Sequence, residues 1–421
     1  MAIDRQTIER VKEEARIEEV VGGFVELKRN GSAFKGLCPF HNEKTPSFIV
    51  TPSKHRYKCF GCGESGDVIG FVMKYLGLGF TDAVVWLAKK YNIPVEEKAQ
   101  TQEDIEYQRK REATLQIMQW ATDWLVEQAE AHQDSVLPFL INEVGITESQ
   151  MRDYSLGFWP LSEHSDCFLS ALKEKGFDLA LAEELGLLRR EEETLSDAFP
   201  GHILFPLRNN SHNTVTLLPM TMDGVHRMVQ MPASAVYRPL SSFYGVYELS
   251  RQRMTQTRIV VRSVEEKLLL QQCCPDTNVV STNGYNITSH FLRHLQDDVR
   301  LVLFYPETPE GVEALMKDLA AILATKVGVK VIFSPERSLA DYLRATAACD
   351  VADYVENNQL SFYKAVAHLY ADHGVEECVE RLVPLLRAVA DEQKKSMYIN
   401  SIARQLAIQS VDIVNRLAQN R

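Results

Sequence analysis

Four potential metal ligands constrain the fold of this chain more than any other feature. Cys38 and His41 are separated by two residues, and after seventeen intervening residues Cys59 and Cys62 repeat the same spacing. Two such pairs let four side chains converge tetrahedrally on one zinc ion, and a site with four protein ligands is structural. The glycines on either side of Cys62 fit a tight turn that points backbone amides at the sulfurs. The spacing therefore predicts a zinc ribbon that holds Zn²⁺.

Composition and charge limit the class of protein. The chain has 421 residues, of which 45% are hydrophobic and 24% charged, as in soluble globular proteins of roughly three domains. Its net charge of −11 excludes a uniformly basic nucleic-acid coat but permits a local basic surface. No apolar run approaches the ~20 residues of a membrane span, and the charged N-terminus is unlike a signal peptide. We expect a cytoplasmic protein without a membrane partner.

The hydrophobic pattern divides the chain into successive segments. Residues 1–95 contain the zinc pattern and form a compact unit. Residues 96–112 are polar and lack glycine and proline, which predicts a solvated helical linker. An amphipathic helix follows, and the segment 113–257 mixes helices with short strands such as 202–208 and 214–220.

The second half of the chain has a different pattern. In 258–350 short β-branched runs alternate with helical runs, which predicts a largely parallel sheet covered by helices. The tail, 351–421, is predicted to be helical, with little to break it beyond Gly374 and Pro384. The fold class is therefore multidomain α/β: a zinc ribbon, an α+β segment, an α/β sandwich and a helical bundle.

Basic and aromatic residues are interleaved around the zinc pattern. Between Phe24 and Lys58 there are seven basic residues and two acidic ones. Positive charge beside aromatic faces is typical of proteins that hold single-stranded nucleic acid, whereas the alternative is a solvated basic face with the aromatics in a small core. The predicted nucleic-acid contacts here are Lys28, Arg29, Lys35, Lys44, Phe48, Lys54, Arg56, Tyr57, Lys58 and Phe60.

Residues 37–73 read LCPFHNEKTPSFIVTPSKHRYKCFGCGESGDVIGFVM and closely resemble the N-terminal zinc-binding domain of bacterial DnaG-type primases. The resemblance continues more loosely through the chain. It includes YSLGFWP (154–160), FPGHILFPLRN (199–209), the run ending in FYGVYEL (243–249), a TOPRIM-like order of elements (258–343) and a helical stretch (382–408).

The resemblance implies a primase-type polymerase core whose TOPRIM subdomain lies in 258–350, ahead of a helical bundle. It also implies synthesis of short RNA primers on single-stranded DNA with Mg²⁺. A replicative helicase or an active primase is the implied protein partner. The resemblance ends before the helicase-binding domain that the family carries.

The family's catalytic acids are replaced in this chain. Where the family has Glu-Gly-x-x-Asp after a strand, this chain has Arg262 in place of the glutamate. Where the family has Asp-x-Asp-x-x-Gly, both aspartates are missing, with Pro306 and Thr308 in their positions. The third acidic pair falls at Ser338 and Ala340. A guanidinium about 4 Å from a divalent cation is repelled by about 8 kcal/mol at an effective dielectric near 20.

Nearby carboxylates could rebuild a displaced metal site, with Glu266 and Glu307 as the principal substitutes. Others in reach are Glu265, Glu310 and Asp341. A one-residue shift on a strand turns a side chain to the opposite face, which disfavours such a rebuilt site.

The family's basic ridge for template and nucleotide is also reduced. Its counterparts here are Arg208, Arg227 and Arg238, each as compatible with a surface ion pair as with a phosphate contact. Apolar residues 217–220 occupy a stretch that is glycine-rich with a basic residue in the family.

Two functions of different class follow. The favoured one is a replication protein that binds single-stranded DNA through the zinc ribbon and has lost or impaired primer synthesis. The other is an active primase that uses a rebuilt metal site and Mg²⁺. A third reading keeps only the zinc fold, with nothing bound.

Overall fold

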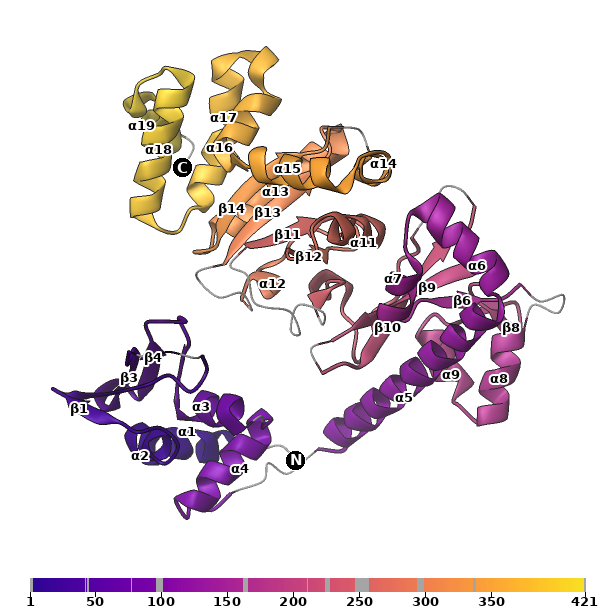
Figure 1. Cartoon of the computed structure of the whole chain (residues 1–421), viewed down its shortest axis with the longest axis horizontal. Coiled ribbons are helices and arrows are strands. Elements are labelled where there is room, and N and C mark those ends of the chain that lie inside the picture. Colours follow the sequence, from indigo (N-terminus) through magenta and orange to yellow (C-terminus); the bar gives the residue numbers. More distant parts are fainter. Residues whose placement is uncertain are drawn as a thin grey trace. The chain divides into compact units, whose positions relative to one another are not determined.

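The structure of the chain is a computed structural model. It describes residues 3–41, 43, 45–76, 78–95, 101–161, 166–209, 211–223, 228–246, 257–293, 299–335 and 338–419. The chain divides into two compact units, residues 1–108 and residues 109–421 (Figure 1). Each unit is described by itself below.

The first unit combines a small antiparallel sheet with helices. The sheet runs in the order β1 (Lys28–Asn30), β2 (Ala33–Gly36), β3 (Phe48–Thr51), β4 (Arg56–Cys59) and β5 (Ser65–Gly66). The helices are α1 (Arg5–Glu14), α2 (Ile17–Gly22), α3 (Val68–Leu76) and α4 (Phe80–Lys90). Alternate residues of β3 and β4 are buried, so one face of the sheet packs on the helices and the other faces solvent.

A long helix, α5 (Gln102–Ala131), follows the first unit in the chain. The described part of the predicted linker, residues 101–112, is largely exposed and makes up the beginning of this helix. From Ile117 onward its apolar residues are buried in the second unit. The predicted solvated segment and the predicted amphipathic segment are therefore continuous in one helix.

Next comes a mixed subdomain built on a three-stranded antiparallel sheet of order β10-β9-β6. Its strands are β6 (Gly157–Trp159), β9 (His202–Arg208) and β10 (Thr214–Thr221), with a hairpin of β7 (Leu188–Glu191) and β8 (Thr194–Asp197). Its helices are α6 (Gln133–Phe139), the π-helical turn η2 (Leu140–Val144), α7 (Glu148–Asp153), α8 (Cys167–Lys175) and α9 (Leu179–Glu184).

The predicted α/β sandwich is confirmed as a five-stranded sheet of order β12-β11-β13-β14-β15, parallel except for β15. The strands are β11 (Thr257–Val261), β12 (Asn278–Ser281), β13 (Arg300–Tyr305), β14 (Gly328–Phe333) and β15 (Leu360–Ser361). The helices are α11 (Val264–Cys273), α12 (Ser289–Arg293), α13 (Pro309–Leu323), α14 (Leu339–Ala345) and α15 (Ala348–Asn357).

The C-terminal helices are α16 (Phe362–Leu369), α17 (Gly374–Ala388), α18 (Glu392–Leu406) and α19 (Ser410–Gln419). They share a core with the sheet, in which Phe362, Leu382 and Ile402 pack with Leu315 and Val331. One expectation was wrong in detail. Pro384 does not break the tail but lies within α17, and the helices end instead near residues 389–391 and 407–409.

The mixed subdomain and the sandwich are packed together within the second unit. The Gln150 side-chain amide donates to the carbonyl of Leu268 over 2.8 Å, and Tyr244 forms a β-bridge with Ser281. The predicted boundary at 257/258 therefore separates two subdomains that share a core, to which the sandwich contributes Val264 and Leu268 of α11.

Across the described residues no single helix is long and apolar enough to cross a membrane. The pair α3 and α4 passes that test of length and composition only when joined, and the two meet at 111°.

Candidate metal centre and nucleic-acid interface

The structure brings together the four residues of the predicted zinc site. Their ligand atoms all lie within 4.8 Å of one another. Cys38 follows β2, Cys59 ends β4, and the two remaining ligands lie in the turns beyond. The sulfurs of Cys38 and Cys62 are 3.8 Å apart, and His41 Nδ1 is 3.8 Å from the sulfur of Cys59. Three thiols and one imidazole, gathered in this way, are a donor set that fits Zn²⁺.

The turn after Cys59 points backbone N–H groups at its sulfur. Gly61 N and Cys62 N donate to Cys59 Sγ over 3.3 and 3.4 Å. A Cβ at Gly61 would lie 2.8 Å from both His41 Nε2 and Ser47 Oγ, so only glycine fits there. Gly63 has a φ of +79°, which side chains rarely adopt. These contacts are the ones expected from the glycines around Cys62.

Hydrogen bonds also favour the thiolate form of Cys59. Burial opposes ionisation of this thiol, but its hydrogen bonds with Ser47 and with the two backbone amides outweigh it and lower its pKa. Burial instead raises the pKa of Cys38 to about 12 and raises that of Cys62.

Glu43 supports this site and was not singled out from the sequence. Its carboxylate accepts from Cys38 N over 2.7 Å and from Ser47 N over 3.1 Å, and it lies 3.4 Å from His41 Nε2. The hydrogen bond from the Ser47 hydroxyl is the main reason that the pKa of Glu43 is lowered. A carboxylate behind a ligand histidine orients the ring. The sequence signal that could have identified Glu43 as a partner of the site is its position two residues after His41.

Several of the predicted basic contacts lie on the solvent face of the small sheet. Residues directly opposite each other on neighbouring strands share a face. The register therefore forms one outward row across the sheet, from Lys28 through Lys35, Ile49 and Lys58 to Ser65. Arg56 and Thr51 form the adjacent pair on that face. We call Lys28, Lys35, Arg56 and Lys58 the basic row.

The other predicted basic contacts lie apart from the basic row. Arg29 is opposite Phe34 on the other face, and its Nε donates to the carbonyl of Gly31 over 3.4 Å. Lys54 is exposed in the 3₁₀ turn η1 (Pro52–Lys54). Lys44 lies outside the described residues.

Two predicted aromatic contacts are contradicted by burial. Phe48 is fully buried and Tyr57 is 2% exposed, stacked on each other in the core of the first unit. Their alternation in β3 and β4 turns them away from solvent, so neither can stack on a base. Phe60 is 67% exposed, and Lys58 Nζ lies 5.3 Å from its ring centroid. Of the three predicted aromatics, Phe60 alone presents a free face.

In the second unit, Arg262 follows the carboxyl end of β11 and is bonded to the protein. Its guanidinium donates to the carbonyl oxygens of Gly284 and Tyr285 over 2.6 and 3.2 Å. Its Cζ lies 5.7 Å from the ring centroid of Tyr305, the last residue of β13. A positive charge therefore stands between the ends of these two strands.

Glu266 is engaged in helix capping. Its carboxylate accepts from the backbone N–H groups of Arg262 and Ser263, each over 2.9 Å, while Ser263 Oγ accepts from Glu266 N. This reciprocal arrangement is a capping box at the start of α11. Its neighbour Glu265 is paired with Arg344 over 2.5 Å. Burial raises the pKa of Glu265 to about 7, with Arg344 acting in the opposite direction.

The counterparts of the second acidic motif have helix-capping and surface roles. Thr308 caps α13, accepting from Gly311 N over 3.2 Å, and Pro309 occupies the first turn. Glu307 is half-exposed and lies 3.0 Å from His368 Nε2. Pro306 has no side-chain oxygen.

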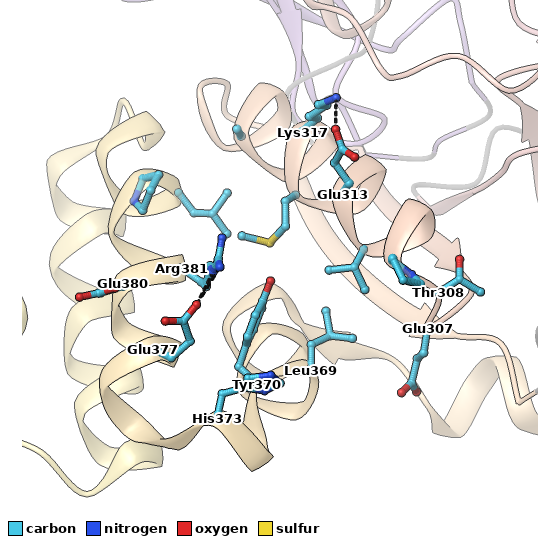
Figure 2. A pocket seen from close by; sticks show the side chains of 16 residues that line it. Glu307, Thr308, Glu313, Lys317, Leu369, Tyr370, His373, Glu377, Glu380 and Arg381 are labelled. Atoms are coloured by element: carbon cyan, nitrogen blue, oxygen red, sulfur yellow. Dashed lines mark hydrogen bonds and ion pairs between the residues drawn. The ribbon is translucent and has the colours of Figure 1, made fainter.

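Glu307 and Thr308 line one end of a groove of about 1100 Å³ between α13 and α17 (Figure 2). Two other carboxylates of this groove are paired within their own helices, and Glu380 is paired with Arg416 of α19. Glu313 lies 2.7 Å from Lys317, and Glu377 lies 2.8 Å from Arg381.

The residues at the predicted third acidic position also have a helix-capping role. Ser338 caps α14 and accepts from Asp341 N over 3.2 Å, while Ala340 is buried. Asp341 lies 3.1 Å from Arg344. Within the described ranges, the only cluster of histidine, cysteine or acidic ligand atoms close enough to share one metal ion is that of Cys38, His41, Cys59 and Cys62.

Two of the three arginines of the predicted basic ridge lie among the described residues. Arg208 ends β9 and is partly exposed, Arg238 is exposed before the 3₁₀ turn η3 (Pro239–Ser241), and Arg227 lies outside the described residues. Residues 217–220 are buried in β10, where their apolar side chains complete the core.

Two protein families match the chain. Residues 3–103 match the CHC2 zinc finger of DnaG, and residues 124–250 match the N-terminal domain of the DNA primase catalytic core. Several relatives are named DNA primase. One from Halalkalibacterium halodurans is 28% identical over 79% of this chain and 56% of its own length. One from Staphylococcus aureus is 28% identical over 100% of this chain and 71% of its own length. The chain thus spans little more than half of the first relative.

Solved structures share the fold. The zinc-binding and RNA polymerase domains of the Aquifex aeolicus primase match with a TM-score of 0.60 and 20% identity, covering 97% of this chain and 98% of that one. A DNA primase domain from Pseudomonas aeruginosa matches with a TM-score of 0.64 and 17% identity, covering 73% of this chain and 100% of that one. A third matching structure is a DnaG primase catalytic domain bound to single-stranded DNA, with a TM-score of 0.63 and 14% identity over 72% of this chain and 99% of that one.

Proposed function

This chain belongs to the DnaG-type DNA primase family, and from that premise we propose that it is a replication protein that binds single-stranded DNA through its zinc ribbon. We propose further that its TOPRIM subdomain has lost primer synthesis or retains it only weakly. As a replication protein it acts in the cytoplasm, with a replicative helicase or an active primase as its protein partner.

The basic row supports binding of single-stranded DNA. Lys28 and Lys35 lie on the adjacent strands β1 and β2 of one solvent face, and Lys58 lies on β4 of that face, with Ile49 of β3 between it and Lys35 and Arg56 beside it. Strands in a sheet are about 4.8 Å apart, so the interval from Lys35 to Lys58 across β3 is about 10 Å, and the positive charges gather on one face of an otherwise acidic protein. Phe60, next to Lys58 in space, adds an exposed ring on which a base can stack.

A single observation carries the proposed loss of catalysis: the guanidinium of Arg262 stands after β11, bonded to two backbone carbonyls. The family's chemistry needs carboxylates at strand ends to hold two Mg²⁺ ions. The residues present do not fit that requirement, because Arg262, Pro306 and Thr308 supply a cation and neutral groups. We therefore assign no step to Mg²⁺ in this chain.

The alternative is an active primase with a rebuilt site, and the names of the relatives favour it. Glu266 would have to leave the capping box of α11, and Glu307 would have to leave His368. The first change would leave the backbone N–H groups of Arg262 and Ser263 without their acceptor, and the second would break the contact between Glu307 and His368.

Primer synthesis on single-stranded template tests the proposal. The full chain, with zinc bound, is incubated with labelled ribonucleotides and Mg²⁺ or Mn²⁺, beside the Staphylococcus aureus primase as positive control. We expect no product, or far less than in the control, together with retained binding of the template. Metal-dependent product at the level of the control would contradict the loss of catalysis. Glu266→Gln and Glu307→Gln, with Glu313→Gln as control, would then identify the rebuilt site.

A further inference from the structure

An open pocket of about 520 Å³ lies in the first unit beside the zinc site. One of its walls contains Cys38 and the following Pro39, and another contains the rings of Phe24 and Tyr75. Lys28 and Lys35 of the basic row also line it. The volume is within the range of small-molecule pockets in proteins.

The aromatic wall is exposed but rigidly supported. Tyr75 is 38% exposed, and its ring stacks on that of the fully buried Phe71, with centroids 5.5 Å apart and planes 8° apart. Its centroid is 4.8 Å from that of Phe24, which also contacts Trp86 at 6.0 Å. Leu37, 48% exposed, adds an aliphatic surface to the same pocket. A planar apolar ligand therefore meets surfaces that are already in place.

Positive charge and apolar surface meet at this pocket. Lys28 and Lys35 lie opposite each other on β1 and β2. The acidic residue of the lining, Glu26, is exposed and stays 3.9 Å from Lys28 Nζ, a surface pair of little energetic value. The two lysines remain able to hold phosphates while the rings receive an apolar group.

We propose that this pocket receives one unstacked nucleobase of the single-stranded DNA bound along the basic row. The inference rests on the proposed function, because Lys28 and Lys35 belong to both surfaces. Every base has a π-face, so the ring of Tyr75 accepts a base from a strand whose phosphates follow the lysines. Zinc ligation holds Cys38 and Pro39 in place, so the pocket depends on the metal site for one wall.

This pocket supplies the stacking surface that the sequence assigned to Phe48 and Tyr57. Those two rings belong to the buried core of the first unit, whereas Tyr75 comes from α3, which follows the interleaved basic and aromatic segment between Phe24 and Lys58. The base-binding residues are therefore Tyr75 and Phe24.

Two probes of equal length and charge separate base binding from phosphate binding. Binding of the zinc-loaded full chain is measured to an oligothymidylate and to an abasic oligonucleotide with the same backbone. One stacked base contributes about 1–3 kcal/mol, so we expect the wild type to prefer oligothymidylate roughly tenfold or more. Tyr75→Ala should remove most of that preference and leave abasic binding unchanged. Tyr75→Phe should keep it, as should Tyr107→Ala, a control at an exposed tyrosine outside the pocket.

Zinc content shows that each variant is folded, and a second readout needs no variant. A 2-aminopurine base in the oligonucleotide should lose fluorescence on binding, because stacking on an aromatic ring quenches it. The base pocket is overturned if the wild type binds both oligonucleotides equally, or if Tyr75→Ala keeps the full preference. In those cases salt-sensitive abasic binding still upholds the proposed DNA binding. If the wild type binds neither strand, both proposals fail.

Discussion

The guanidinium of Arg262 lies against the ring of Tyr305, and the Tyr305 hydroxyl donates to the buried carboxylate of Asp318. Asp318 also accepts from Asn286 Nδ2 and Ile287 N, each over 2.8 Å, and burial raises its pKa. Arg262 in turn bonds residues 284 and 285. Residues 284–287 of the loop after β12 are thus held by one polar chain of contacts that runs from Arg262 through Tyr305 to Asp318.

Arg262→Glu alone should not restore primer synthesis. Pro306 and Thr308 still lack carboxylates, and the new carboxylate would lie beside that of Glu266. We expect the variant to be less stable by about 1.5–3 kcal/mol, the value of hydrogen bonds to a charged group. Template-directed incorporation and urea unfolding measure the two effects.

The matched control is Arg404→Glu, which reverses a charge at an exposed residue of α18 in the same unit. Robust synthesis by Arg262→Glu would show that our placement of the acidic motifs is wrong.

Cys59→Ser should lose zinc and unfold the zinc ribbon. Cys59 accepts two backbone hydrogen bonds in the turn, lies 3.1 Å from Ser47 Oγ and is fully buried, and the metal supplies on the order of 10 kcal/mol to such a module. Zinc content and proteolysis of the first unit are the measurements. Cys349→Ser, at an exposed cysteine in the second unit, is the control and should bind zinc normally. Stoichiometric zinc in Cys59→Ser would overturn the ligand assignment.

Glu43→Gln should weaken zinc binding without abolishing it. The amide oxygen can still accept from Cys38 N and Ser47 N, but the NH2 group in place of Oε2 loses the charge that faces His41 Nε2 and the acceptor for the Ser47 hydroxyl. Loss of such an outer partner costs about 10- to 100-fold in metal affinity. Competition with a chelator measures it, with the exposed Glu26→Gln as control. An unchanged affinity would show that Glu43 only shapes the loop.

Removing two charges of the basic row should reduce the salt dependence of DNA binding. For single strands the slope of log K against log salt changes by about 0.7 per phosphate contact. Arg56→Gln with Lys58→Gln should therefore flatten it by about 1.4. Lys317→Gln, at a lysine paired on α13, should leave the slope unchanged. The assignment of this face fails if the double variant keeps the wild-type slope.

Glu265 should make the protein less stable as the pH rises from about 4.5 to about 7. Its pKa is raised from 4.5 to about 7 by burial, so the folded state binds more protons than the unfolded state in this window. Stability present at low pH is then lost as the carboxyl ionises, by an amount on the order of 3 kcal/mol. Glu265→Gln should flatten this part of the pH profile in urea unfolding, whereas the exposed Glu313→Gln should not.

A profile as steep in Glu265→Gln as in the wild type would assign the pH dependence to other groups. The ion pair with Arg344 would then outweigh burial, contrary to the raised pKa.

Some of the candidate sites could be read from local spacing. The spacing within the pairs Cys38/His41 and Cys59/Cys62 predicts the metal centre, because two ligands with two residues between them in a knuckle must lie near each other whatever the rest of the chain does. The alternation of strands and helices after residue 257 likewise predicts the parallel sheet. The proposed replacement of the family's acids at 262, 306 and 308 rests on the same kind of local reading, because Arg262 and Pro306 each directly follow an apolar run and Thr308 lies two residues beyond Pro306.

The tertiary structure decided which side of the small sheet each residue faces, and the sequence could not. Phe48 and Tyr57 are buried because strand register turns them to the core, whereas Lys35 and Lys58 share the outer face. Tyr75 became a candidate only because α3 packs its ring beside Phe24. The sequence shows that aromatic residues and lysines are present in this segment. Strand register and long-range packing decide which of them are buried and which can contact a ligand.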